Sequence, residues 1–158
     1  AMLAAPGANT AVVQSMEIRR SALVLHPAMD MFRLVQDVPA YPDFLGWCVS
    51  SQVREQTPEY QVATLVVKVS GVTQSFTTHN RFVPGERPTL SLVDGPFRHL
   101  AGEWLFEPLG SEGSKVTLVL SFDFSSKVLS SAFRRGFTHI ADRLVSEFSQ
   151  RADVIYGK

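Results

Sequence analysis

Apolar and polar side chains alternate through most of the chain between residues 49 and 124, which is the pattern of β-strands with one buried face. It is clearest over 114–124, where one face carries the apolar residues Val116, Leu118, Leu120, Phe122 and Phe124. Similar runs lie at 49–57, 60–70, 73–83, 88–94 and 101–109, and an earlier run lies at 17–25. Because turn residues but no helical pattern separate the later runs, the sequence predicts a mostly antiparallel sheet of about seven strands.

Two short helices are expected after the first strand. Apolar residues recur at helical spacing from Met31 to Val35, after Pro27, which suits the first turn of a helix. This helix should stop before the segment Asp37-Val38-Pro39. Residues 41–45 should form at best a turn or a second short helix, because Pro39 and Pro42 bracket Tyr41.

A long helix is predicted from Val128 to about Tyr156, a stretch with no proline and one internal glycine, Gly136. At ~100° per residue, one face of this helix carries the apolar residues Phe133, Phe137, Ile140, Leu144 and Phe148. The far face carries Arg135, His139 and Arg143. A helix of about 28 residues is roughly 42 Å long, so it should cross the concave face of a twisted sheet diagonally and leave a gap beneath it.

The composition fits one small folded domain. The 158 residues include 45% hydrophobic and 19% charged residues, which argues against a disordered, coiled-coil or collagen-like chain. The 15 basic and 15 acidic side chains cancel, so the protein as a whole has no electrostatic preference for nucleic acid, and no DNA partner is expected. We expect a flexible N-terminal tail over residues 1–15, without the pattern of a signal peptide, and a folded domain over 16–158.

Cys48 is the only cysteine, which excludes an intrachain disulfide and multi-cysteine zinc sites and favours a cytoplasmic location. The four histidines are scattered, with no spacing typical of a metal or catalytic pair. We therefore expect no metal, no cofactor and no catalytic residue, so that the protein is a binding protein rather than an enzyme.

Four segments carry a resemblance to a known family. They are VQDVPAYPDFLGWC at 35–48, FTTHN at 76–80, LVDGPF at 92–97 and RADVIYG at 151–157. The order of elements resembles the helix-grip fold of START-like and polyketide cyclase-like domains. The segments are similar to the coenzyme Q-binding protein family, whose bacterial branch includes the ribosome association toxin A proteins, over about residues 17–157.

The resemblance implies an α+β helix-grip fold, with a curved sheet wrapped around the long C-terminal helix. It also implies that the domain holds ubiquinone or a similar polyprenyl lipid in an internal cavity and supports respiration. The alternative that it implies is a ribosome association toxin that binds the large ribosomal subunit and blocks subunit joining. A polyketide cyclase-like enzyme is a third hypothesis, which lacks an acid–base pair in the sequence.

The ligand-binding wall expected from these faces is mainly aromatic. It comprises Tyr41, Phe44, Trp47, Val67, Phe76, Trp104, Phe106, Leu120, Phe122, Phe133, Phe137, Ile140 and Leu144. A pocket of about 300–1,000 Å³ would suit such a ligand, although the same residues also fit a fully packed core. Candidate donors for a quinone head are Thr77, His79, Asn80, Arg81 and Tyr41, and exposed strand positions explain most of them equally well.

The helix stripe of Arg135, His139 and Arg143 has two interpretations. It is either an ordinary solvated face or a surface that contacts the phosphates of ribosomal RNA or of an anionic lipid. In the second case the protein would also make a peripheral contact with the inner membrane or with the large ribosomal subunit.

Overall fold

The computed structural model of the chain describes residues 15–126 and 130–157. Its elements follow one another in the order β1 (Met16–Val24), α2 (Ala28–Gln36), the 3-10 helix η1 (Val38–Asp43), β2 (Cys48–Gln56), β3 (Tyr60–Val69), β4 (Val72–Arg81), β5 (Thr89–Asp94), β6 (Phe97–Leu109), β7 (Gly113–Phe124) and α3 (Ser131–Tyr156). This confirms the predicted α+β helix-grip arrangement of a strand, two short helices, six strands and a long helix.

The strands form one antiparallel sheet of seven strands in the order β1-β7-β6-β5-β4-β3-β2. Neighbours in the sheet are also neighbours along the chain, except that β1 pairs with β7 and becomes an edge strand. Ser70 and Gly71 make the tight β3–β4 turn with φ angles of 51° and 79°, the left-handed conformation that two-residue hairpins need. β6 begins at Phe97 rather than at the predicted residue 101, because Phe97 already pairs with Phe124 of β7.

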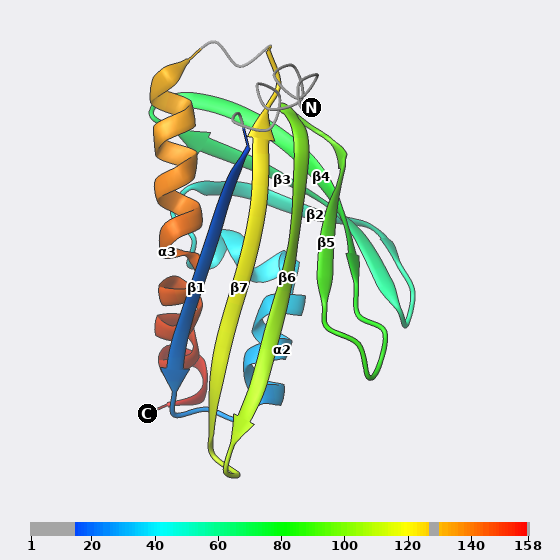
Figure 1. The fold of residues 1–158 in the computed structure, drawn as a ribbon, viewed down its shortest axis with the longest axis vertical. Coiled ribbons are helices and arrows are strands. Elements are labelled where there is room, and N and C mark those ends of the chain that lie inside the picture. The colour runs from blue at the N-terminus through cyan, green and yellow to red at the C-terminus, as the bar shows by residue number, and fades with distance from the viewer. Residues whose placement is uncertain (1–14, 127–129, 158) are drawn as a thin grey trace, which may run out of the picture.

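The sheet curves around α3. Figure 1 shows β1 and β7 running beside this helix while β2, β3 and β4 cross behind it. The predicted helix start at Val128 lies outside the described residues, and the described helix begins at Ser131, where the Ser130 side chain accepts a hydrogen bond from the N–H of Phe133 at 3.1 Å. The buried side of α3 consists of Phe133, Phe137, Ala141, Val145, Phe148 and Ala152.

The two short helices close the concave face of the sheet that α3 leaves uncovered. Met31, Leu34 and Val35 of α2 and Val38 of η1 are buried there. Tyr41 of η1 packs edge-to-face on Phe148 of α3, with ring centroids 5.5 Å apart. The interior is therefore enclosed by the sheet on one side and by three helical segments on the other.

Polar contacts attach α3 to β1 and α2. Arg20 of β1 forms a salt bridge with Asp142, and the buried His26 lies 2.7 Å from Asp153, measured from Nε2 to Oδ1. The Tyr156 hydroxyl donates to the carbonyl of Asp30 at 3.3 Å. These contacts join α3 to β1, to the β1–α2 connection and to α2. No helix among the described residues is long and apolar enough to span a bilayer.

Candidate functional site

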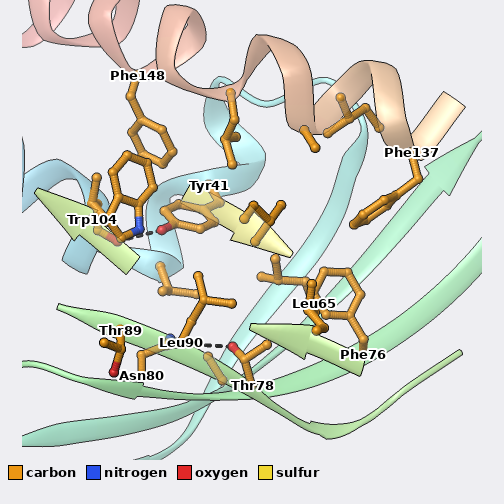
Figure 2. Close-up of a pocket in the computed structure, with 18 of the residues that line it drawn as sticks. Tyr41, Leu65, Phe76, Thr78, Asn80, Thr89, Leu90, Trp104, Phe137 and Phe148 are labelled. Atoms are coloured by element: carbon orange, nitrogen blue, oxygen red, sulfur yellow. Dashed lines mark hydrogen bonds between the residues drawn. The ribbon is translucent and has the colours of Figure 1, made fainter. Parts of the chain in front are cut away.

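A cavity of about 110 Å³ lies between α3 and the sheet. Its wall consists of Val35, Val38, Tyr41, Trp47, Ala63, Leu65, Phe76, Thr78, Asn80, Phe82, Thr89, Leu90, Leu100, Trp104, Leu120, Phe137, Ile140, Ala141, Leu144 and Phe148. Figure 2 shows Phe137 and Phe148 reaching down from α3, while Thr78, Asn80 and Thr89 lie on the strands opposite. The hollow expected beneath the helix is present, but it is smaller than the expected 300 Å³ or more. Aromatic side chains from η1, β4, β6 and α3 line it.

The structure brings many of the predicted wall residues together. Those that line the cavity are Tyr41, Trp47, Phe76, Trp104, Leu120, Phe137, Ile140 and Leu144. Phe106 instead lines an outer groove beside α2. Phe44, Val67, Phe122 and Phe133 lie outside the cavity wall and pack in or against the hydrophobic core.

One end of the wall is polar. Thr78 Oγ1 donates to Asn80 Oδ1 at 2.9 Å, and Asn80 Nδ2 donates to Oε1 of the buried Gln61 at 3.1 Å. Asn80 has a second amide hydrogen, and no further partner for it is found among the described residues. Thr78 and Asn80 can therefore present a hydroxyl and an amide to a bound group.

The expected donors are only partly where the sequence placed them. Asn80 and Tyr41 line the cavity, whereas Thr77 bonds Thr64 at 2.7 Å and His79 stacks on Tyr60, both away from the cavity wall. Arg81 is exposed and pairs with Glu86. Side chains at every second position of a strand share one face. The alternation of β4 therefore places Thr78 and Asn80 on the same inward face as Phe76, and this is the sequence signal that identifies them.

None of the described residues that line the cavity carries a charge at neutral pH. The only acidic hydroxyl in the wall, Tyr41, donates to the carbonyl of Val35, and burial raises its pKa well above the ordinary tyrosine value. Within residues 15–126 and 130–157, no group of three or more His, Cys, Asp or Glu residues could hold a metal ion. The described part of the wall therefore offers no charged partner to a group inside the cavity.

Sequence reasoning missed several wall residues. Val35 and Val38 come from the short helices, Leu90 and Leu100 come from β5 and β6, and Phe82 follows the end of β4. The apolar positions of α2 were predicted, but their contact with the cavity depends on how α2 folds back onto the sheet. No local pattern carries that information.

The predicted basic stripe is on the outer side of α3. Arg135, His139 and Arg143 are all exposed. Within the described part of the chain, Arg135 and Arg143 form no salt bridge, whereas Arg20, Arg33, Arg81, Arg87 and Arg98 each pair with a carboxylate. The stripe therefore presents two uncompensated positive charges to solvent, with the His139 side chain between them.

Comparison with known proteins identifies relatives of nearly the same length. The family described as polyketide cyclase / dehydrase and lipid transport matches residues 24–149. The ribosome association toxin RatA of Vibrio cholerae is 44% identical over 142 residues, covering 90% of this chain and 99% of the relative. RatA of Escherichia coli K12 is 39% identical over 141 residues, covering 89% of each chain.

A more distant relative is the mitochondrial coenzyme Q-binding protein COQ10 homolog B of Xenopus laevis. It is 29% identical over 133 residues, covering 81% of this chain and 54% of the relative. These curated relatives bear toxin and binding names rather than enzyme names.

Solved structures show the same fold. The Zhui aromatase/cyclase of Streptomyces sp. R1128 superposes with a TM-score of 0.76 at 17% identity, covering 88% of this chain and 94% of that one. The 18 kDa protein CC1736 of Caulobacter crescentus superposes with a TM-score of 0.69 at 26% identity, covering 90% and 99%. The fold is thus shared with both of these proteins.

Proposed function

The chain belongs to the polyketide cyclase/dehydrase and lipid transport family, and from its likeness to the ribosome association toxins we propose that it binds the large ribosomal subunit and blocks subunit joining. The observation that carries this proposal is the 44% identity over 142 residues, which extends over 99% of the relative. Because the match covers nearly the whole relative, every folded part of the relative has a counterpart in this chain.

The exposed stripe of α3 is the surface that we assign to this contact. Ribosomal RNA is a polyanion, and arginines that contact phosphates release counterions and gain affinity. Arg135 and Arg143 suit this role because no carboxylate among the described residues neutralises them. The zero net charge of the chain limits the contact to a small area.

Cosedimentation with purified large subunits tests this proposal. The double variant Arg135→Glu/Arg143→Glu should lose at least about tenfold in affinity, since it replaces attraction to phosphate with repulsion. Arg19→Glu/Lys115→Glu is the matched control, because both side chains are exposed on β1 and β7 and the net charge changes equally. If the stripe variant and the control cosediment alike, the stripe is not the contact surface.

The cavity supports a second role, binding of an apolar ligand such as ubiquinone or a similar polyprenyl lipid, without catalysis. The observation in its favour is the uncharged, largely aromatic wall. Burial contributes about 25 cal/mol per Å² of apolar surface, so the tail of a lipid needs no specific partner. The name of the Xenopus relative agrees with a quinone as the ligand.

Native mass spectrometry of the purified protein with decyl-substituted dimethoxymethylbenzoquinone tests the second role. We expect a complex with one ligand, and we expect Phe137→Asp to abolish it, because the charge would be placed in the cavity wall. Absence of any complex with the wild-type protein would contradict this role and leave the ribosomal role standing.

A further inference from the structure

Five exposed apolar side chains gather at one end of the molecule, and we call them the apolar tip. They are Leu23, Leu25, Leu109, Val154 and Ile155, with exposed fractions of 74%, 76%, 51%, 73% and 48%. Single exposed apolar side chains are ordinary, whereas a group of them on one part of a surface marks a contact with another molecule or with a membrane. Neither proposed function uses this end of the protein.

Three segments that are distant in the sequence meet at the apolar tip. Figure 1 shows the end of β1, the β6–β7 turn and the C-terminal end of α3 together at the lower end of the molecule. A Cβ atom on Gly113 would lie 3.3 Å from the carbonyl oxygen of Val24, so the β6–β7 turn adjoins the end of β1. His26, the residue after Leu25, lies 2.7 Å from Asp153 of α3, measured from Nε2 to Oδ1. The five side chains therefore belong to one region.

The apolar tip is convex, because its side chains leave the body in different directions. Leu23 lies on the outer face of the sheet, since its neighbours Ala22 and Val24 pack against the core from the inner face. Leu109 is the last residue of β6, and Val154 is exposed on the last turn of α3. A partner with one flat, rigid face cannot cover all three directions. Fluid lipid can surround such an end without any matching shape.

The size of the apolar tip also argues against a stable protein interface. Full burial of an aliphatic side chain removes roughly 60–120 Å² from water, so five such side chains supply at most about 600 Å². A stable protein–protein interface buries about 800 Å² on each partner. A bilayer needs less, because one acyl chain is enough for weak and reversible membrane binding.

Charges of both signs surround the apolar tip. Lys115 lies opposite Leu23 in the β1–β7 pairing and opposite Glu107 in the β6–β7 pairing, and the exposed Glu112 lies in the turn between β6 and β7. This mixed rim gives no net attraction to an anionic surface. Burial of apolar side chains must therefore drive the contact, and salt should have little effect on it.

We propose that the apolar tip inserts into the interfacial layer of a phospholipid bilayer and holds the protein there reversibly. Leu23 and Leu25 span about 7 Å of extended chain, which fits the 5–10 Å depth to which interfacial segments are buried. Arg143 of the α3 stripe precedes Val154 by eleven residues, or about 16 Å of helix, so the stripe stays outside the lipid. This inference depends on neither proposed function.

Flotation of the full chain with phosphatidylcholine vesicles tests the inference. Binding should be half-complete at about 0.1–1 mM lipid, the range in which a single acyl chain binds. It should change by less than about twofold between 0.1 and 0.5 M salt, because no ion pair with the lipid is involved. Flotation with vesicles that also contain phosphatidylserine should be no stronger than this by more than about twofold.

Leu25→Ser/Val154→Ser is the variant of the apolar tip, since both side chains are more than 70% exposed and the core is untouched. Its affinity for the vesicles should fall at least about tenfold, because two of the inserted side chains become polar. Val49→Ser/Val93→Ser is the matched control, at 55% and 57% exposure on β2 and β5, and it should float like wild type. Urea unfolding checks that both variants are folded.

A second variant gives a direct signal for insertion. Tryptophan fluorescence of Leu25→Trp should be quenched by vesicles of brominated phosphatidylcholine, because bromine atoms on the acyl chains quench only a nearby indole. Val93→Trp has the same two native tryptophans and should show no quenching beyond that of wild type.

Four results would overturn the inference. The first is no flotation of wild type with phosphatidylcholine, and the second is equal flotation of the tip variant and its control. The third is flotation only with anionic vesicles that is lost at 0.5 M salt and in Arg135→Glu/Arg143→Glu, which would move the contact to the α3 stripe. The fourth is dimerisation in sedimentation velocity that the tip variant abolishes, which would make a second copy the occupant. Cosedimentation with large subunits and quinone binding should be unchanged in the tip variant, so both proposed functions are tested separately.

Discussion

Gly136 of α3 lies so close to Val69 of β3 that a Cβ atom on the glycine would come within 2.3 Å of Val69 Cγ1. The helix backbone can therefore approach β3 this closely only because residue 136 is glycine. This contact holds one end of α3 down, next to the Ser70 hydroxyl, which donates to the carbonyl of Ala132 at 3.2 Å.

Gly136→Ala should destabilise the protein, although alanine favours helices over glycine by about 1 kcal/mol. The clash falls on a β-branched side chain with a stiff χ1, so relieving it should cost about 1–3 kcal/mol net. Urea unfolding measures the difference. In a Val69→Ala background the same substitution should cost much less, and an equal cost in both backgrounds would show that the contact is not responsible.

Stability should fall at alkaline pH because of Cys48. Burial raises the pKa of its thiol to about 11 from an ordinary value of 9.0. Between these two values the unfolded chain loses the proton while the folded protein keeps it, so the free energy of unfolding decreases as the pH rises. We expect a contribution of about 1 kcal/mol from pH 8.5 to pH 10.5.

Urea unfolding of wild type and Cys48→Ala across this pH range measures that contribution. The variant should lose less stability than wild type between the two pH values. Parallel curves would show that the thiol titrates alike in the folded and unfolded states.

Ala141→Leu should fill the cavity, because Ala141 is buried and lines it. The free energy of unfolding should change by less than about 1 kcal/mol, since the added methyl groups enter existing space. Binding of the decyl quinone should fall at least about tenfold, and cosedimentation with large subunits should be unaffected. Loss of cosedimentation would mean that the ribosomal contact depends on the interior.

Ala152→Leu is the control for this substitution. Ala152 is also a buried alanine of α3, but it does not line the cavity. The same added volume should therefore cost about 1–3 kcal/mol of stability. If both leucine variants unfold alike, there is no usable space beside Ala141.

Ribosome association should weaken with salt in proportion to the number of phosphate contacts. With two or three contacts from the α3 stripe, the logarithm of the association constant should fall against the logarithm of salt concentration with a slope of about −2. Arg143→Gln should make the slope shallower by about 1, whereas Lys115→Gln on the outer sheet face should not. An association constant independent of salt would contradict a phosphate contact.

The sequence predicted the order of the elements well, because strand alternation and helical periodicity are local signals. It could not predict which inward-facing residues line the cavity. Trp104 and Phe106 share one face of β6, yet Trp104 reaches the cavity and Phe106 only the groove, where Phe32 of α2 packs edge-to-face on Phe106. That division depends on where a distant helix crosses the sheet.

The same reason explains the predicted wall residues that lie outside the cavity. Phe133 and Phe122 are about 1% and 0% exposed, and both surround Phe124 and Phe137 in a ring cluster at one end of α3. Their periodicity correctly indicated burial. Whether a buried ring faces a void or another ring is decided by tertiary packing, which periodicity does not record.

The order of the elements along the chain also bears on how the molecule is made. α3 provides a full wall of the interior, yet it is synthesised after all seven strands, and β1 cannot complete its pairing until β7 exists. The apolar face of the sheet in a nascent chain therefore stays uncovered until α3 has been synthesised. That interval is when the protein is most open to aggregation or capture by chaperones, and an apolar molecule present at that moment could be enclosed as the helix closes.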